Sequence, residues 1–87
     1  MRVFLQQLPV SNEAPKYIQL TLQPDLFGGW VLLRETGHIG GRSQLRRELF
    51  LDEQQAATAF EKARDSQINR GFQVTFISGH AAQDGTP

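Results

Sequence analysis

Apolar segments that read as strands follow one another closely in the first part of the chain, and this spacing constrains the fold most. The short connections favour an antiparallel meander, because a parallel crossover needs a dozen or more residues. Ile18, Leu20 and Leu22 alternate with polar residues, which is the period of a half-buried strand. The predicted strands are Val3–Leu8, Tyr17–Leu22, Trp30–Leu33 and Leu45–Leu51.

One long helix is predicted after the fourth strand. Asp52 is a suitable N-cap, and Gln55 follows three residues later in the position of a capping box. Asn69 or Gly71 supplies a left-handed end to the helix. The residues that fall on one helical stripe, and are expected to face a sheet, are Ala56, Phe60, Ala63 and Gln67.

A last strand completes the predicted fold. Phe72, Val74 and Phe76 alternate and are expected on one face of that strand. We therefore predict an α+β fold, with an antiparallel sheet of about four to five strands and one long helix across one face. A chain of 87 residues has room for one core, so residues 1–77 are assigned to a single domain. Residues 78–87 are small and polar and are predicted to form a flexible tail.

The composition excludes several classes of function. Lys+Arg and Asp+Glu are both 9, so nucleic-acid binding would require a local basic patch. There is no Cys, and the two His have no ligand cluster around them, so neither a metal site nor a cofactor is predicted. No apolar run reaches the roughly 20 residues that span a bilayer. A cytoplasmic protein without a membrane partner is expected.

Residues 34–47 combine glycines with arginines. Arginine presents a planar fork that suits phosphate oxygens, and glycine-rich backbone can expose N–H groups to an anion. A phosphate-binding surface is one interpretation. The other is a solvated hairpin whose arginines pair with carboxylates of the helix, such as Glu53 and Glu61. Strand alternation also places Arg46 and Arg47 on opposite faces.

The order of these elements resembles the WGR domain from about Tyr17 to Phe76. Thr36 and His38 stand where that family has Trp and Arg, and Gln67 stands where it usually has Lys. In the WGR domain of poly(ADP-ribose) polymerases, the motif Trp and Arg are implied to meet a DNA strand end at sugar and phosphate. The matching positions are Tyr17–Leu20, Gly29–Val31, Gly37, Ile39, Gly40, Gln44, Phe50, Ala56, Phe60, Gly71 and Phe72.

The resemblance and the local arginines together predict a non-catalytic module that binds DNA or another phosphate-bearing polymer. No enzyme is predicted, because His38 has no carboxylate at a spacing that would make an acid–base pair. The alternative is a protein–protein interaction module, which could also be a homodimer, with Phe27, Trp30 and Phe50 as its surface. The predicted nucleic-acid contacts are Arg34, Thr36, Gly37, His38, Gly40, Arg42 and Arg46.

Overall fold

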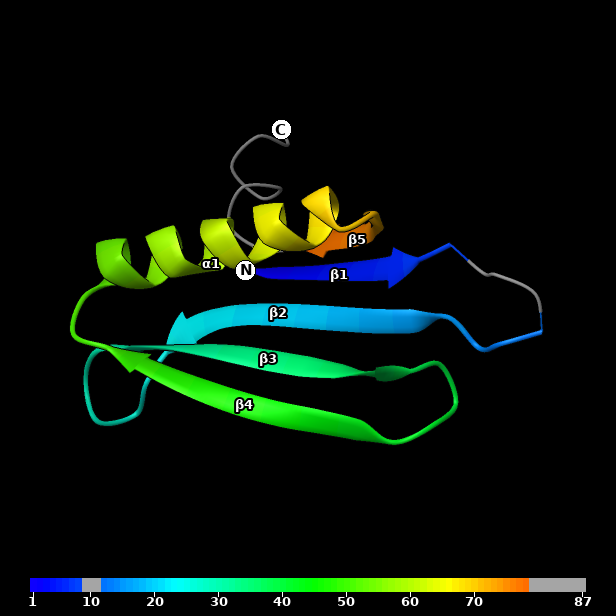
Figure 1. Cartoon of the computed structure of the whole chain (residues 1–87). Coiled ribbons are helices and arrows are strands. Elements are labelled where there is room, and N and C mark those ends of the chain that lie inside the picture. The colour runs from blue at the N-terminus through cyan, green and yellow to red at the C-terminus, as the bar shows by residue number, and fades with distance from the viewer. Residues whose placement is uncertain (9–11, 79–87) are drawn as a thin grey trace.

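The computed structural model describes residues 1–8 and 12–78, which form one antiparallel sheet and one helix (Figure 1). The order of the strands across the sheet is β4-β3-β2-β1-β5, so the last strand lies beside the first. The α+β class and the antiparallel sheet are confirmed. The elements along the chain are β1 (Arg2–Gln7), β2 (Lys16–Pro24), β3 (Trp30–His38), β4 (Ser43–Phe50), α1 (Glu53–Asn69) and β5 (Phe72–Ser78).

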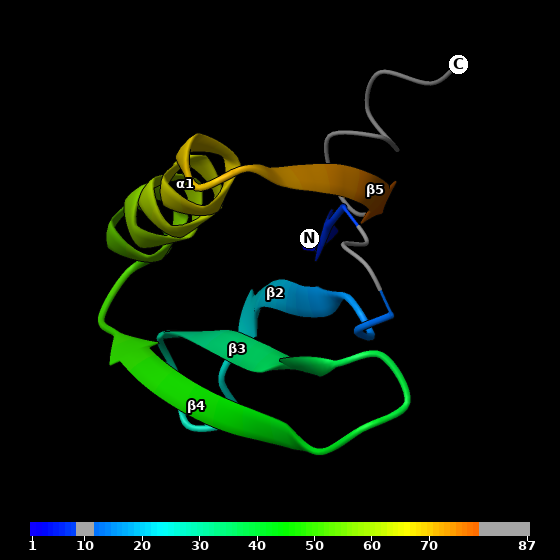
Figure 2. The ribbon, with the colours of Figure 1, turned by 45° about the vertical axis from the view of Figure 1, so that its right-hand side comes forward.

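The sheet curves into an arc, and α1 lies on its concave side (Figure 2). The helix carries the chain from β4 at one edge of the sheet to β5 at the other edge. It therefore crosses the central strands and packs mainly on β2 and β3. The convex face of the sheet is left without a covering element among residues 1–8 and 12–78. Ser78 ends β5, and the rest of the predicted tail lies outside the described residues.

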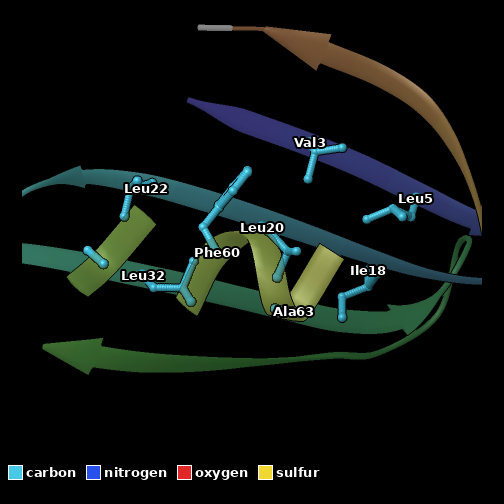
Figure 3. Close-up of a cluster of buried hydrophobic side chains, with 9 residues drawn as sticks. Val3, Leu5, Ile18, Leu20, Leu22, Leu32, Phe60 and Ala63 are labelled. Atoms are coloured by element: carbon cyan, nitrogen blue, oxygen red, sulfur yellow. The ribbon is translucent and has the colours of Figure 1, made fainter. Parts of the chain in front are cut away.

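The core lies between α1 and the concave face of the sheet (Figure 3). Three of the four residues of the predicted helical stripe, Ala56, Phe60 and Ala63, are the buried residues of α1, and the fourth, Gln67, is partly exposed. Two of the buried residues are alanines, whose small side chains let the helix lie close to the strands, and Phe60 is the large one. The strand residues packed around them are Val3, Leu5, Ile18, Leu20, Leu22 and Leu32.

Both predicted helix boundaries are supported by hydrogen bonds or backbone geometry. The Gln55 N–H donates to Asp52 Oδ1 at 2.8 Å, so Asp52 is the N-cap. At the other end Gly71 has φ +97°, which favours glycine, and its N–H donates to the Ile68 carbonyl at 3.0 Å. Of the two residues proposed to end the helix, Gly71 is therefore the one that turns the chain.

β3 is longer than predicted and runs through the glycine-rich segment to His38. Gly37 lies near the end of β3 and between two strands, opposite Tyr17 of β2 on one side and Ser43 of β4 on the other. A Cβ at this position would lie 2.4 Å from the Arg42 carbonyl oxygen. Glycine here permits a close approach of two strands. The turn itself is confined to residues 39–42, with Gly40 at φ +78°.

The sequence predicts that Phe72, Val74 and Phe76 share one face of β5, and this prediction is wrong for Phe76. The register between β1 and β5 shifts between Phe4 and Leu5, with Phe4 opposite Phe76 and Leu5 opposite Val74. Thr75 is the extra residue of this β-bulge. Phe76 consequently lies on the convex face with Phe4, while Val74 lies on the face that carries α1.

Candidate nucleic-acid interface

A cleft of about 900 Å³ opens at one end of the sheet, where α1 ends beside the β3–β4 hairpin. At this end β1 and β3 finish and β2 and β4 begin, so segments far apart in the sequence meet there (Figure 1). Residues from all five strands and from α1 line the cleft. The side chains that matter for its chemistry are Lys16, Thr36, His38, Arg42, Gln67 and Arg70.

The charged side chains that line the cleft are all basic. Lys16, Arg42 and Arg70 are exposed and come from three different segments, and no carboxylate from residues 1–8 or 12–78 lines the cleft. None of the three takes part in an ion pair within residues 1–8 and 12–78. A concave surface with unpaired cations attracts anions, and the arginine fork matches phosphate oxygens. The chain as a whole has zero net charge, so this basic surface is local.

The structure brings together four of the seven residues that the sequence proposed for nucleic-acid contact. Thr36, Gly37, His38 and Arg42 line the cleft. The remaining three, Arg34, Gly40 and Arg46, are not among its lining residues.

Arg34 is engaged elsewhere. Its Nη2 lies 2.9 Å and its Nε 3.2 Å from Glu48 Oε1 on the neighbouring strand. Arg47 lies 3.8 Å from Asp25. The predicted pairing of these arginines with the helix carboxylates Glu53 and Glu61 is therefore wrong, because their partners lie within the sheet and its connecting loop.

Lys16, Gln67 and Arg70 were missed by the sequence analysis as site residues. They lie 20 or more residues from the glycines of the hairpin. The pairing of β2 with β3 places Lys16 opposite His38, whereas the packing of α1 across the sheet brings Gln67 and Arg70 to the cleft. One signal was present for Arg70, since it immediately precedes Gly71, the residue that ends the helix. A side chain at that position must lie at the end of α1.

Two backbone donors of the turn at residues 39–42 are already used within the protein. The Ile39 N–H donates to the Pro15 carbonyl at 3.0 Å, and the Gly41 N–H donates to the His38 carbonyl at 2.8 Å. Gly37 is paired with strands on both sides. Anion recognition at this cleft would therefore depend mainly on side chains and less on the glycine backbone that the sequence suggested.

Tyr17 also lines the cleft, at its convex side, and its ring and hydroxyl have defined neighbours. Its ring stacks on Phe4 with centroids 5.3 Å apart. Its hydroxyl donates to Glu35 Oε2 at 2.6 Å. The hydrogen bond to the Glu35 carboxylate is the main cause that raises the pKa of Tyr17 above the usual 10.0, and partial burial raises it further.

We expect the single Tyr of this chain to titrate at higher pH than a free tyrosine. The folded state holds the phenolic proton more tightly than the unfolded chain does. The stabilisation of the folded state by the protonated Tyr17 is therefore fully present below the ordinary pKa and is lost as the pH rises through the raised pKa. Ultraviolet absorbance of tyrosinate measures this directly. Glu35→Gln should lower the pKa, whereas Glu48→Gln, which removes a carboxylate bound to Arg34, should not.

The comparison with protein families decides the classification. A model of the WGR domain matches residues 1–76. The chain belongs to the WGR domain family. In this WGR domain Thr36 and His38, the two positions that differ from the family motif, line the cleft at the end of β3.

One curated relative is the uncharacterised protein y4dW of Sinorhizobium fredii, which is 30% identical over 71 residues. The aligned region is 82% of this chain and 35% of that protein, so the chain spans about a third of the relative's length. No solved structure matches this WGR domain.

Two further observations describe this WGR domain. No helix within residues 1–8 and 12–78 is long and apolar enough to cross a membrane. The same part of the chain contains no group of three or more His, Asp or Glu side chains that could hold a metal ion.

Proposed function

We propose that this WGR domain is a non-catalytic module that binds nucleic acid, DNA in particular, through phosphates held in the cleft. The observation that carries the proposal is the charge of the cleft, where Lys16, Arg42 and Arg70 are exposed and where the described part of the chain contributes no carboxylate. Membership of the WGR family supports the same function.

The cleft accounts for how such a module could work without the family's Trp and Arg. A motif Arg would supply one cation at the end of β3, where this chain has His38. Three other cations converge on the same cleft from β2, from the hairpin and from the end of α1. Binding would then depend on phosphate contacts, which fix the position of the strand and carry little sequence information.

The test is fluorescence anisotropy with a short labelled single strand and with a duplex that has a terminal phosphate, each at low salt and at roughly 0.15 M salt. Binding should weaken as the salt concentration rises, because each phosphate bound by the protein releases counterions. The double variant Arg42→Ala/Arg70→Ala should bind less tightly. It should also lower the slope of log affinity against log salt by about one for each phosphate that the variant no longer neutralises.

Arg64→Ala is the matched control, since Arg64 lies on α1, is paired with Asp65 at 3.0 Å and is not part of the cleft. Arg46→Ala tests the strand position that the sequence proposed and that does not line the cleft. Both single variants should bind as the wild type does. Absence of binding at low salt, or equal losses of affinity in the control and cleft variants, would rule out the proposed site.

A further inference from the structure

No strand within residues 1–8 and 12–78 pairs with the outer edge of β4. β4 is an edge strand of the sheet (Figure 1). It has eight residues, of which only Phe50 is not exposed. It contains neither proline nor a register shift against β3. The opposite edge, β5, belongs to a pair whose register is interrupted by a bulge. A continuous, regular edge is a template for strand addition, and bulges work against it.

The two faces of β4 have different chemistry. Arg46 and Glu48 lie on the face that carries α1, since they are opposite Arg34 and Leu32. The convex face carries two exposed leucines, Leu45 at 62% and Leu49 at 66%, with Arg47 between them. Charged side chains on an edge discourage arbitrary strands. A partner strand must therefore place opposite charges and apolar groups at matching positions.

We propose that β4 pairs antiparallel with β4 of a second copy of this chain, across a two-fold axis at Arg47. In this register Arg46 lies opposite Glu48 of the second copy, and Leu45 lies opposite Leu49 of the second copy. The symmetry produces each of these pairs twice. Opposite charges and apolar pairs directly across two strands are stabilising. The two sheets become continuous, and both helices lie on the same side.

Hydrogen bonding limits the other symmetric registers. The outward N–H and C=O groups of an edge strand come from every second residue. Two facing residues must therefore both belong to the set that points outward or both to the set that does not. A two-fold axis meets this condition only when it passes between a residue and the same residue of the second copy. An axis at Arg46 places two Arg46 side chains opposite each other, and an axis at Glu48 does the same with two glutamates. An axis at Leu45 pairs fewer residues of β4 than an axis at Arg47 does, because Leu45 lies near the start of the strand. At Arg47 the two arginines meet, but each lies 3.8 Å from Asp25 of its own chain, which reduces their repulsion.

The ion pairs within one chain also fit this arrangement. Both Arg34 nitrogens contact the same oxygen of Glu48, Oε1, so Oε2 can accept from Arg46 of the second copy. Arg46 lies directly opposite Arg34, which is also cationic. Arg46 itself has no ion pair within the described residues. Pairing two copies would give each Arg46 a carboxylate and reduce the repulsion within this like-charged pair.

The residues that determine the proposed register lie outside the cleft, although Gln44 at the end of the paired stretch also lines it. Arg46, Leu45 and Leu49 are not among its lining residues, whereas Ser43 and Gln44 at the start of β4 are. Edge pairing buries a small area, so the dimer should be weak and should form with increasing concentration. A protein that does not bind DNA could still dimerise through β4. A protein that does not dimerise could still bind DNA through the cleft.

Sedimentation-velocity measurements over a range of concentrations test the proposal. The wild type should shift from monomer to dimer as its concentration rises. Arg46→Glu places two glutamates opposite each other on each side of the axis and should abolish the shift. The double variant Arg46→Glu/Glu48→Arg restores opposite charges across the interface and should recover it.

Cysteine cross-linking tests the register. Four residues of extended strand separate Leu45 from Leu49 by about 13 Å, so cysteines at these positions cannot bridge within one chain. The chain has no Cys of its own. Leu45→Cys/Leu49→Cys should therefore give a covalent dimer under mild oxidation, whereas Leu45→Cys and Leu49→Cys alone should not. A wild type that stays monomeric at every concentration, or equal cross-linking of the single variants, would overturn the proposal.

Discussion

Phe60→Ala should lower the free energy of unfolding by about 3–5 kcal/mol. Phe60 is 2% exposed and is the only large side chain among the buried residues of α1. Its removal leaves a cavity between the helix and β2 and β3 that the flanking alanines are too small to fill (Figure 3). Small domains are stable by about 5–15 kcal/mol, so this one change removes a large part of the total.

Urea denaturation followed by circular dichroism measures this change, and Phe27→Ala is the matched control. Phe27 is 95% exposed, so the same substitution there should change the free energy of unfolding by less than about 0.5 kcal/mol. A similar decrease in both variants would mean that α1 does not depend on Phe60 for its attachment to the sheet.

Gly37→Ala should destabilise the protein by about 1–3 kcal/mol. The added Cβ would lie 2.4 Å from the Arg42 carbonyl oxygen and 3.0 Å from the Ser43 Cα. These are backbone atoms, so the overlap can be relieved only if the β3–β4 hairpin shifts. Because Gly37 and Arg42 both line the cleft, the shift should also weaken nucleic-acid binding.

Gly41→Ala, in the same hairpin, is the control for this prediction. A Cβ at Gly41 would make only ordinary contacts at 3.5 Å, and the residue does not have positive φ. Thermal unfolding should therefore show a lower midpoint for Gly37→Ala and a nearly unchanged midpoint for Gly41→Ala. Equal midpoints for the two variants would contradict the close approach of the strands at Gly37.

The parts of the fold that the sequence predicted well depend on local signals. Asp52 caps the helix through a neighbour three residues away, and the alternation of Ile18, Leu20 and Leu22 identifies one face of a strand. Phe60 follows Ala56 by one helical turn. In each case residues within a few positions of one another are sufficient, because the periods of helix and strand determine which side chains share a face.

Predictions failed where the relevant atoms come from distant segments. Phe76 moves to the convex face because of a bulge against β1, and β1 lies more than 70 residues earlier. The predicted third strand ends at Leu33, because the local pattern does not reveal that Gly37 has strand neighbours at Tyr17 and Ser43. The convergence of Lys16 and Arg70 on the hairpin has the same origin. Tertiary packing creates this cleft, and no local motif encodes it.

Of the three aromatic residues predicted for a protein contact surface, only Phe27 is free. Trp30 and Phe50 are partly buried and pack against the core, which leaves them little area for a partner. They lie opposite each other in β3 and β4, on the face that carries α1. The exposed apolar residues suited to an interface are instead the leucines of β4, on the convex face.

The position of β5 has a consequence for how the domain folds. β1 to β4 can form as a meander from local hairpins, but β1 stays an open edge until the chain has reached Ser78, the partner of Arg2. Closing so long a loop is entropically costly and slow compared with forming a hairpin. We expect the docking of β5 to be a late event on the folding pathway. During synthesis the outer hydrogen bonds of β1 can form only after the chain beyond α1 has been made, because their partner is β5.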